Sequence, residues 1–282
     1  MSVVRLTMRR VEKPWGRRDL PPAFGAVAAE AEPIGEIWFE DPRGRDPLLL
    51  VKYLFTSDKL SIQVHPDDAA AREMGLRNGK DEAWLVLDAE PGAQIGLGLR
   101  EAVSKEVLRA AALDGTLQDM VEWRAAVAGD SYYSPAGTIH SIGGGLKLIE
   151  VQQNMDVTYR LYDFGRPREL HLDEAVGAAR SAPYIRPFQP YEKAPGRTIL
   201  SEGGKFVLER VQGPRTGRVV IDPRRPLWLI PIAGGGRIGT ERLRPGGTWM
   251  VEGDAYLETG DATDMLIAYP GARVYEYLFR AE

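Results

Sequence analysis

The sequence predicts a mostly β protein made of two antiparallel sandwich-like or barrel-like halves with a few short helices. Short segments rich in valine, isoleucine and leucine recur along the chain, and turns containing glycine and proline separate them. This rhythm is typical of all-β folds. At 282 residues the chain is longer than one average domain. Its hydrophobic share of 44% is that of an ordinary folded protein, so each half can bury a core.

Strands are expected in six apolar segments and helices in four short ones. The strand segments are 48–55, 60–65, 82–88, 146–152, 206–211 and 227–233. The helical segments are 67–75, 104–115, 116–121 and 171–180. Asp67 or Asp68, Ser104 and Thr116 are suitable helix caps, and Gly75 is a suitable end for the first helix.

A proline-rich stretch divides the predicted strands into two groups. Residues 181–196 contain four prolines, which favours an extended connection. We therefore expect a first domain over 1–180 with a small helical insertion, and a second domain over 197–282. The second domain contains no histidine, so we expect it to bind no metal and to cover sheet surface of the first.

Charge and composition exclude several classes of protein. The 36 basic and 40 acidic residues are intermixed and leave a net charge of -4, so the sequence predicts no nucleic-acid partner and no membrane-binding arm. There is no cysteine, which excludes disulfides, thiolate metal ligands and a cysteine nucleophile. No apolar run approaches the roughly 20 residues that span a bilayer. We expect a cytoplasmic protein.

The first of only three histidines lies in a strand-like segment beside a possible second ligand. Side chains two apart on a strand share a face, so Gln63 and His65 are expected to point together, with Ile62 and Val64 opposite. Glu82 opens the next strand after a helical excursion. We expect that strand to fold back antiparallel beside the first, which would bring the Glu82 carboxylate to His65.

The second histidine completes a spaced motif. Gly129, Pro135, Gly137 and His140 have the spacing of the second motif of cupins, which are small jelly-roll barrels that carry a metal. The chain resembles that superfamily here, apart from Gly144, where the motif usually has asparagine. The resemblance implies two cupin-like jelly-roll domains, of which the second is metal-free.

Further motifs resemble one family of cupins, type I mannose-6-phosphate isomerase in its short bacterial form. They are Gln63–Pro66, Lys80–Glu82, His140, Glu150–Arg166, Lys13–Gly16 and Gly35–Trp38. The resemblance covers about residues 10 to 175, and the rest resembles only a second, weaker jelly roll. The chain departs from the family at Met155, where a small polar residue is usual.

The resemblance implies a zinc site. By that likeness the ligands would be Gln63, His65, Glu82 and His140. Two neutral imidazoles, an amide oxygen and one carboxylate are acceptable zinc ligands, and they leave the ion a net positive charge. The resemblance also implies the substrate class, a hexose phosphate.

The implied reaction interconverts mannose 6-phosphate and fructose 6-phosphate through enediol proton transfer. Arg160 is expected to stabilise enediolate or phosphate charge, because its planar guanidinium suits that role. Lys80 is expected to contact phosphate or sugar oxygens, and Asp156 to orient a hydroxyl or assist ring opening. The proton carrier stays open among His65, Glu82, Lys80, Asp156 and a bound water.

Two other functions remain open from the sequence. One is another metal-bound cupin enzyme of the dioxygenase type, and the other is a non-enzymatic sugar-binding cupin. The third histidine, His171, starts a predicted helix, and we interpret it as a surface or capping residue. The glycines 143–145 lack the strand-to-helix setting of a phosphate loop, so we interpret them as a plain turn.

Overall fold

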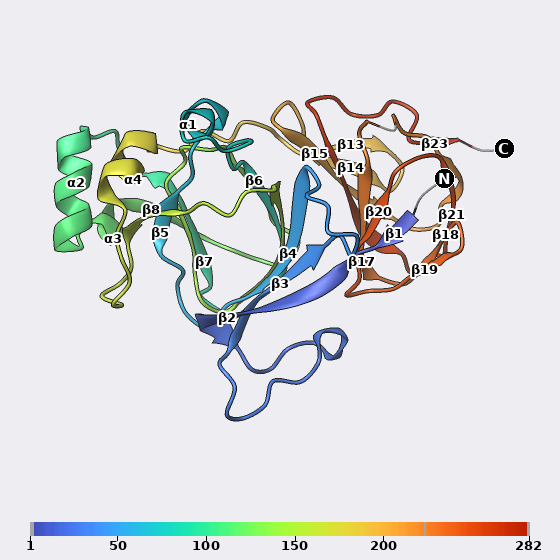
Figure 1. Ribbon diagram of the computed structural model, residues 1–282, viewed down its shortest axis with the longest axis horizontal. Helices are drawn as coiled ribbons and strands as arrows, with labels where there is room; N and C mark the ends of the chain where they lie inside the picture. Colours follow the sequence, from blue (N-terminus) through green and yellow to red (C-terminus); the bar gives the residue numbers. More distant parts are fainter. Residues whose placement is uncertain (1–2, 223, 281–282) are drawn as a thin grey trace.

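The computed structural model describes residues 3–222 and 224–280 and confirms a mostly β protein with short helices (Figure 1). All six expected strands are present within two residues of the expected bounds, and the four expected helices are present as well. The strands of the described residues form four antiparallel sheets, which we number I to IV.

Sheets I and II make up the N-terminal half and face each other. Sheet I contains, in spatial order, β2 (Thr7–Arg17), β3 (Ile34–Glu40), β4 (Leu49–Phe55), β11 (Leu146–Gln153), β6 (Glu82–Ala89) and β9 (Ser131–Ser134). Sheet II contains β12 (Tyr159–Tyr162), β5 (Ile62–Val64), β10 (His140–Ile142), β7 (Gln94–Leu99) and β8 (Val121–Ala125). A buried cluster that includes Trp84, Leu148 and Ile95 joins the two sheets.

Sheets III and IV make up the C-terminal half. Sheet III contains β1 (Val3–Arg5), β20 (Trp249–Val251), β17 (Leu227–Ala233), β22 (Asp264–Pro270), β15 (Phe206–Gln212), β14 (Arg197–Ser201) and β13 (Tyr191–Ala194). Sheet IV contains β19 (Glu241–Leu243), β18 (Gly236–Ile238), β21 (Ala255–Thr259), β16 (Thr216–Val219) and β23 (Phe279–Arg280). A second buried core, with Trp249 and Tyr269 among its largest members, lies between them.

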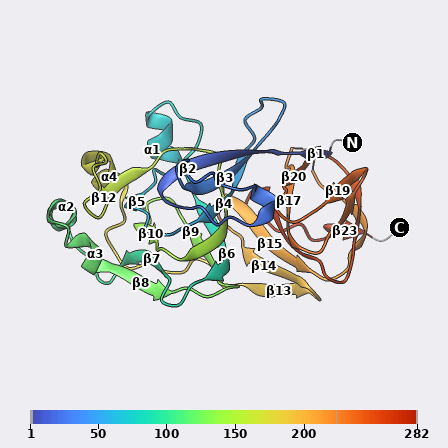
Figure 2. The same ribbon diagram turned by 90° about the horizontal axis from the view of Figure 1, so that it is seen from below.

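The two halves lie side by side and share a core (Figure 2). Sheet I contributes Phe39 and Ile149 to this core, and sheet III contributes Phe206 and Trp228. The C-terminal half therefore covers the outer face of sheet I. This burial stabilises both halves, because apolar area removed from water contributes roughly 25 cal/mol per Å².

The division of the chain into two domains stays a prediction, to which the structure adds two details. Residues 3–5 pair with β20, so the first described strand lies in the sheet of the C-terminal half. The proline-rich connection ends in β13, which pairs with β14. We propose the division with residues 3–5 assigned to the C-terminal half.

The four expected helices belong to the N-terminal half. The first two begin at the expected capping side chains, whereas the expectation for Thr116 is wrong, because it makes no cap hydrogen bond at the third. These helices are α1 (Asp68–Glu73), α2 (Lys105–Asp114), α3 (Leu117–Met120) and α4 (Leu172–Ala178), with a 3-10 turn over Pro22–Phe24. Asp67 accepts backbone hydrogen bonds at the start of α1, and Ser104 accepts one at the start of α2. Gly115 ends α2 at a φ of 84°, which glycine adopts readily. In the described part of the chain, no helix has the length and apolarity to cross a membrane.

Candidate metal centre

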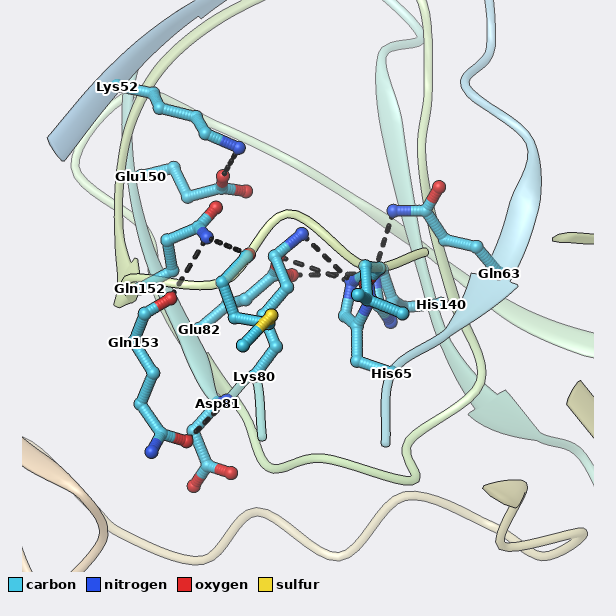
Figure 3. Close-up of polar contacts among 12 residues, drawn as sticks. Lys52, Gln63, His65, Lys80, Asp81, Glu82, His140, Glu150, Gln152 and Gln153 are labelled. Atoms are coloured by element: carbon cyan, nitrogen blue, oxygen red, sulfur yellow. Dashed lines mark hydrogen bonds and ion pairs between the residues drawn. The ribbon is translucent and has the colours of Figure 1, made fainter. Parts of the chain in front are cut away.

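Three side chains that can bind a metal converge between sheets I and II. One ligand atom from each of His65, Glu82 and His140 lies within 4.8 Å of the others, and all three residues are at most 2% exposed. His65 follows β5, Glu82 begins β6 and His140 begins β10. The Glu82 carboxylate lies 3.2 Å from His65 Nε2 and 3.4 Å from His140 Nε2 (Figure 3).

Glu82 reaches His65 by a different route from the one we predicted. The expected antiparallel pairing of its strand beside that of His65 is wrong, because β6 pairs with β11 and β9 in sheet I. The neighbour of β5 is β10, where His140 lies opposite Gln63. The excursion through α1 carries the chain from one sheet to the other. The carboxylate therefore meets the imidazoles across the interior of the barrel.

Both imidazoles are oriented so that Nε2 faces the carboxylate. His65 Nδ1 lies 2.8 Å from the Val157 carbonyl, and His140 Nδ1 lies 2.9 Å from the Thr138 carbonyl. A carbonyl only accepts, so each Nδ1 carries the proton and each Nε2 presents a lone pair. This is the arrangement of metal-binding histidines, whose second nitrogen donates to a backbone or carboxylate oxygen.

Burial decides the charges in this cluster. Desolvation and the nearby Lys80 ammonium lower the pKa of His65 to about 3, and desolvation also lowers the pKa of His140. Burial raises the pKa of Glu82, but the Lys80 ammonium outweighs it and holds that pKa well below its usual range. At neutral pH the site therefore holds two neutral imidazoles and one carboxylate.

These acceptors fit a bound cation. Two nitrogen lone pairs and a carboxylate face one another, and among the described residues nothing donates a hydrogen bond to Glu82 Oε2. Lys80 Nζ donates to the other oxygen at 2.8 Å and lies 3.4 Å from His65 Nε2. A buried carboxylate oxygen without a donor is costly unless a positive charge satisfies it. A metal ion between these three residues would do so.

Gln63 stands beside the three as expected, on the same face as His65. Its Nε2 lies 3.3 Å from His140 Nε2, and its Oε1 accepts a hydrogen bond from the Ser61 hydroxyl at 3.0 Å. Ile62 and Val64 point to the opposite side, into an apolar core. Turning the amide by 180° would present Oε1 to the centre, because the Ser61 hydroxyl can also accept from Nε2.

The residues expected to act on the substrate share one cleft with this centre. Lys80, Asp156 and Arg160 line it together with Gln63 and Glu82. Arg160 lies on β12, opposite Gln63, and its Nη1 donates to the Glu169 carbonyl at 2.7 Å. Its Nε is buried, and among the described residues no acceptor binds it.

The cleft also contains charged residues that the sequence analysis missed. Lys52 and Glu150 face each other across β4 and β11, 3.2 Å apart, and both are buried. Burial lowers the pKa of Lys52, but Glu150 and Glu36 outweigh it and raise that pKa to about 12. Arg168 lines the cleft too, held by the buried carboxylate of Asp163. For Lys52 and Glu150, the available sequence signal was a single charged residue in the middle of an apolar strand.

Two smaller expectations have different outcomes. His171 stands at the start of α4 but makes no side-chain cap there, so the capping interpretation is wrong. It is half-buried, and its Nδ1 instead accepts a hydrogen bond from the backbone N–H of Arg160 at 3.2 Å. The glycines 143–145 form a turn between β10 and β11, as predicted, and Gly145 has a φ of 79°.

Comparison with known proteins gives named relatives. No protein-family model matches the chain. A mannose-6-phosphate isomerase from Streptococcus mutans is 36% identical over 232 residues, which is 73% of this chain and 71% of that protein. The mannose-6-phosphate isomerase ManA of Bacillus subtilis is 40% identical over 136 residues, which is 45% of this chain and 42% of the relative.

Solved structures share the whole fold. The crystal structure of a mannose 6-phosphate isomerase from Bacillus subtilis matches with a TM-score of 0.80 and 27% identity, over 95% of this chain and 99% of that one. A putative mannosephosphate isomerase from Archaeoglobus fulgidus matches with a TM-score of 0.70 over 96% of this chain and 98% of the other. At 18% identity, this second match shows a common fold alone.

Proposed function

The chain belongs to the mannose-6-phosphate isomerase family, and we propose that it interconverts mannose 6-phosphate and fructose 6-phosphate. The observation that carries this proposal is that His65, Glu82 and His140 lie together, buried, beside a cleft lined by Lys80 and Arg160. No feature of the described residues favours the dioxygenase or the sugar-binding alternative.

Enzymes of this family are metal-dependent, and we propose that the metal here is zinc. Its ligands would be Gln63, His65, Glu82 and His140, a set of nitrogen and oxygen donors that zinc accepts. When bound, the ion supplies a positive charge that polarises substrate oxygens and stabilises negative charge in the transition state. Fixed Nδ1 hydrogen bonds hold both imidazoles ready for this role.

The phosphate of the substrate needs fixed cations, and the cleft offers two arginines. Arg160 has an unused buried donor, and Arg168 is held at the cleft by Asp163. Planar guanidinium groups bind phosphate oxygens through paired, charge-assisted hydrogen bonds. We propose that Arg160 also stabilises enediolate charge, so the substrate lies with its reacting carbons between Arg160 and the metal ligands.

Isomerisation also requires a group that moves a proton between C1 and C2 of the open sugar. If His65 and Glu82 hold the metal, they are not free for this task, which leaves Lys80, Asp156 and a bound water from the earlier set. Glu150 joins them, because it lines the cleft and burial raises its pKa above that of an ordinary carboxyl group, which makes its carboxylate a stronger base. Asp156 is exposed at the cleft, where it can orient a sugar hydroxyl or assist ring opening.

We also propose a small-molecule partner and a cytoplasmic location. The partner is the hexose phosphate itself, for which the arginines of the cleft supply complementary charge. A chain without cysteine gains nothing from an oxidising compartment, and this supports the cytoplasm.

The direct experiment is to measure sugar conversion by the purified protein. Mannose 6-phosphate should be converted to fructose 6-phosphate, and mannose without phosphate should be converted far more slowly, because Arg160 and Arg168 would have no anion to bind. Equal rates on the two sugars would contradict the assigned phosphate site. No turnover of mannose 6-phosphate by zinc-loaded protein would contradict the proposed function.

A further inference from the structure

Asp81 lies between two residues of the cleft, yet its side chain points away from it. Lys80 and Glu82 both face the imidazoles, and the Asp81 carboxylate points to the opposite side (Figure 3). This follows from the alternation of side chains along a strand. The carboxylate is buried, and it accepts hydrogen bonds from the Tyr133 hydroxyl at 2.6 Å and from the Ala136 N–H at 3.0 Å.

The C-terminal half contacts this arrangement through one tight turn. Residues 202–205 join β14 to β15, and the N–H of Lys205 donates to the Tyr133 hydroxyl at 3.1 Å. The hydroxyl thus accepts a hydrogen bond from the C-terminal half and donates one to Asp81 in the N-terminal half. Gly204 lies so close that a Cβ there would collide with the hydroxyl oxygen. The Tyr133 ring packs on Phe206 at 5.5 Å, so the contact is fixed from several sides.

Gln153 fixes the backbone of Asp81 from the other side. Its side-chain Oε1 accepts a hydrogen bond from the Asp81 backbone N–H at 3.0 Å. Its backbone N–H donates one to the Asp81 carbonyl at 3.0 Å. Its Nε2 donates to Asp68 at 3.1 Å, and Asp68 pairs with Lys205 Nζ at 2.7 Å. These contacts close a ring from Lys205 through Tyr133, Asp81, Gln153 and Asp68 back to Lys205.

We propose that this ring, which we term the brace, positions the catalytic and metal-binding side chains from the C-terminal half. Asp81 is bonded directly to Lys80 and Glu82, so a shift of Asp81 moves both. A metal ligand has to be held within about 0.5 Å of its working position, which requires a rigid support behind it. The turn 202–205 and Tyr133 are not among the residues that line the cleft, and they are therefore positioning residues.

The brace rests on the proposed function, because it assigns the C-terminal half a part in that function. It gives this half, which holds no imidazole, a role in the chemistry of the other half. It also predicts which measured quantities change when a contact of the brace is removed. Lys80 and Glu82, which Asp81 supports, act on metal affinity and kcat. The proposed phosphate contacts come instead from Arg160 and Arg168, which lie on or after β12 in the opposite sheet. Loosening the brace should change metal affinity and kcat and leave KM nearly unchanged.

The first test compares two tyrosine variants of neighbouring residues on β9. Tyr133→Phe keeps the ring and removes the hydroxyl of the brace, while Tyr132→Phe removes a hydroxyl that bonds only Asp130 among the described residues. Zinc affinity is measured by competition with a chelator, and kcat and KM on mannose 6-phosphate. We expect Tyr133→Phe to weaken zinc binding and lower kcat by about 10-fold or more. We expect KM to stay within about twofold and Tyr132→Phe to match wild type.

The second test acts from the C-terminal half. Gly204→Ala places a methyl group against the Tyr133 hydroxyl, while Gly253→Ala meets open space in the same half. In cobalt-loaded protein, we expect Gly204→Ala to change the visible spectrum of the metal and Gly253→Ala to leave it unchanged. The spectrum reports ligand geometry, which a loss of stability alone does not alter in folded protein.

The outcomes separate the brace from the proposed function. Wild-type protein that binds zinc and isomerises mannose 6-phosphate, together with a Tyr133→Phe variant unchanged in zinc affinity and kcat, would overturn the brace alone. A Tyr133→Phe variant with lower thermal stability but unchanged zinc affinity would overturn it as well. Wild-type protein that neither binds zinc nor isomerises the sugar would overturn the proposed function first, and the brace with it.

Discussion

Glu82 is the only anionic group among the four proposed ligands, so its charge supplies most of the attraction for a divalent cation. Its two oxygens lie 3.2 and 3.4 Å from the imidazole nitrogens that face them. Lys80 already neutralises part of this charge at 2.8 Å. A neutral amide at the same place would leave a cation opposite an ammonium with no anion between them.

We therefore expect Glu82→Gln to weaken zinc binding and turnover together. The loss should exceed about 100-fold, the upper end of what removal of an outer partner of a ligand typically costs. Metal content after dialysis and the rate on mannose 6-phosphate check this. Glu40→Gln, at an exposed ion pair with Arg9, is the matched control and should behave as wild type. Full activity in Glu82→Gln would remove this residue from the ligand set.

Arg160 should behave differently, because its proposed partner is the substrate. We expect Arg160→Ala to keep its zinc and to lose roughly 10²–10³ in kcat, the usual cost of removing one donor to developing negative charge. Arg160→Lys keeps the charge without the planar pair of donors, and its kcat should lie between those of wild type and Arg160→Ala. Wild-type turnover in Arg160→Ala would contradict the charge-stabilising role.

Single buried charges in apolar strands are the residues that local sequence reading undervalued. Lys52 lies in the segment 48–55 and Glu150 in 146–152, and each interrupts a run of aliphatic side chains. The pairing of β4 with β11 sets them opposite each other. That register is a property of distant parts of the chain, so alternation within one segment predicts the facing side but not the partner.

At the scale of elements, strands and helix ends were predictable and strand neighbours were not. Apolar runs and capping residues predicted β4, β6 and α2 within two residues. The wrong step was to pair the strands of His65 and Glu82 because they follow each other in sequence. Both edges of β6 are already occupied, by β11 and β9, so β5 pairs with other strands in the facing sheet.

Ser104 tests the helix ends by stability alone. Its hydroxyl accepts a hydrogen bond from the Val107 N–H at 3.3 Å at the start of α2. This helix lies at the outer end of the N-terminal half and contributes no residue to the lining of the cleft. We expect Ser104→Ala to lower the free energy of unfolding by about 1 kcal/mol, with turnover unchanged. Urea denaturation checks this. Thr116→Ala is the control, because Thr116 makes no cap hydrogen bond to α3 and its hydroxyl donates to the exposed Asp114 at 2.6 Å, so its removal should cost less. Equal losses would contradict the capping assignment.

At the scale of the molecule, the two halves form one unit. They share an apolar core between sheets I and III, and β1 extends the C-terminal sheet from the start of the chain. The sequence predicted that the second half covers the first. It did not reveal that β1 crosses over, because three residues with no turn signal carry no information about a partner some 240 residues away.

The buried imidazoles make the stability of the metal-free protein depend on pH. Burial lowers the pKa of His65 to about 3 and also lowers that of His140, whereas an unfolded histidine titrates near about 6.5. On acidification the unfolded state binds these protons first. The stability contributed by the neutral rings is therefore complete above about pH 6.5 and is lost as the pH falls below it, for His65 down to about pH 3.

For His65 the expected slope reaches about 1.4 kcal/mol per pH unit within that window, and His140 makes the dependence steeper in the same direction. Urea denaturation of chelated protein at pH 7 and pH 5.5 measures it. His65→Asn removes one of the two groups and should show a shallower slope between the same pH values. A free energy of unfolding that does not change between pH 7 and pH 5.5 would contradict neutral buried imidazoles.

The central claim is that one metal ion held by Gln63, His65, Glu82 and His140 is required for isomerisation. The most direct measurement is a titration of chelated protein with zinc, in which bound metal and conversion of mannose 6-phosphate are followed together. We predict that turnover is absent before zinc is added, rises in proportion to bound zinc and stops rising at one ion per chain. Full turnover by the metal-free protein, or stoichiometric zinc binding without turnover, would contradict the claim.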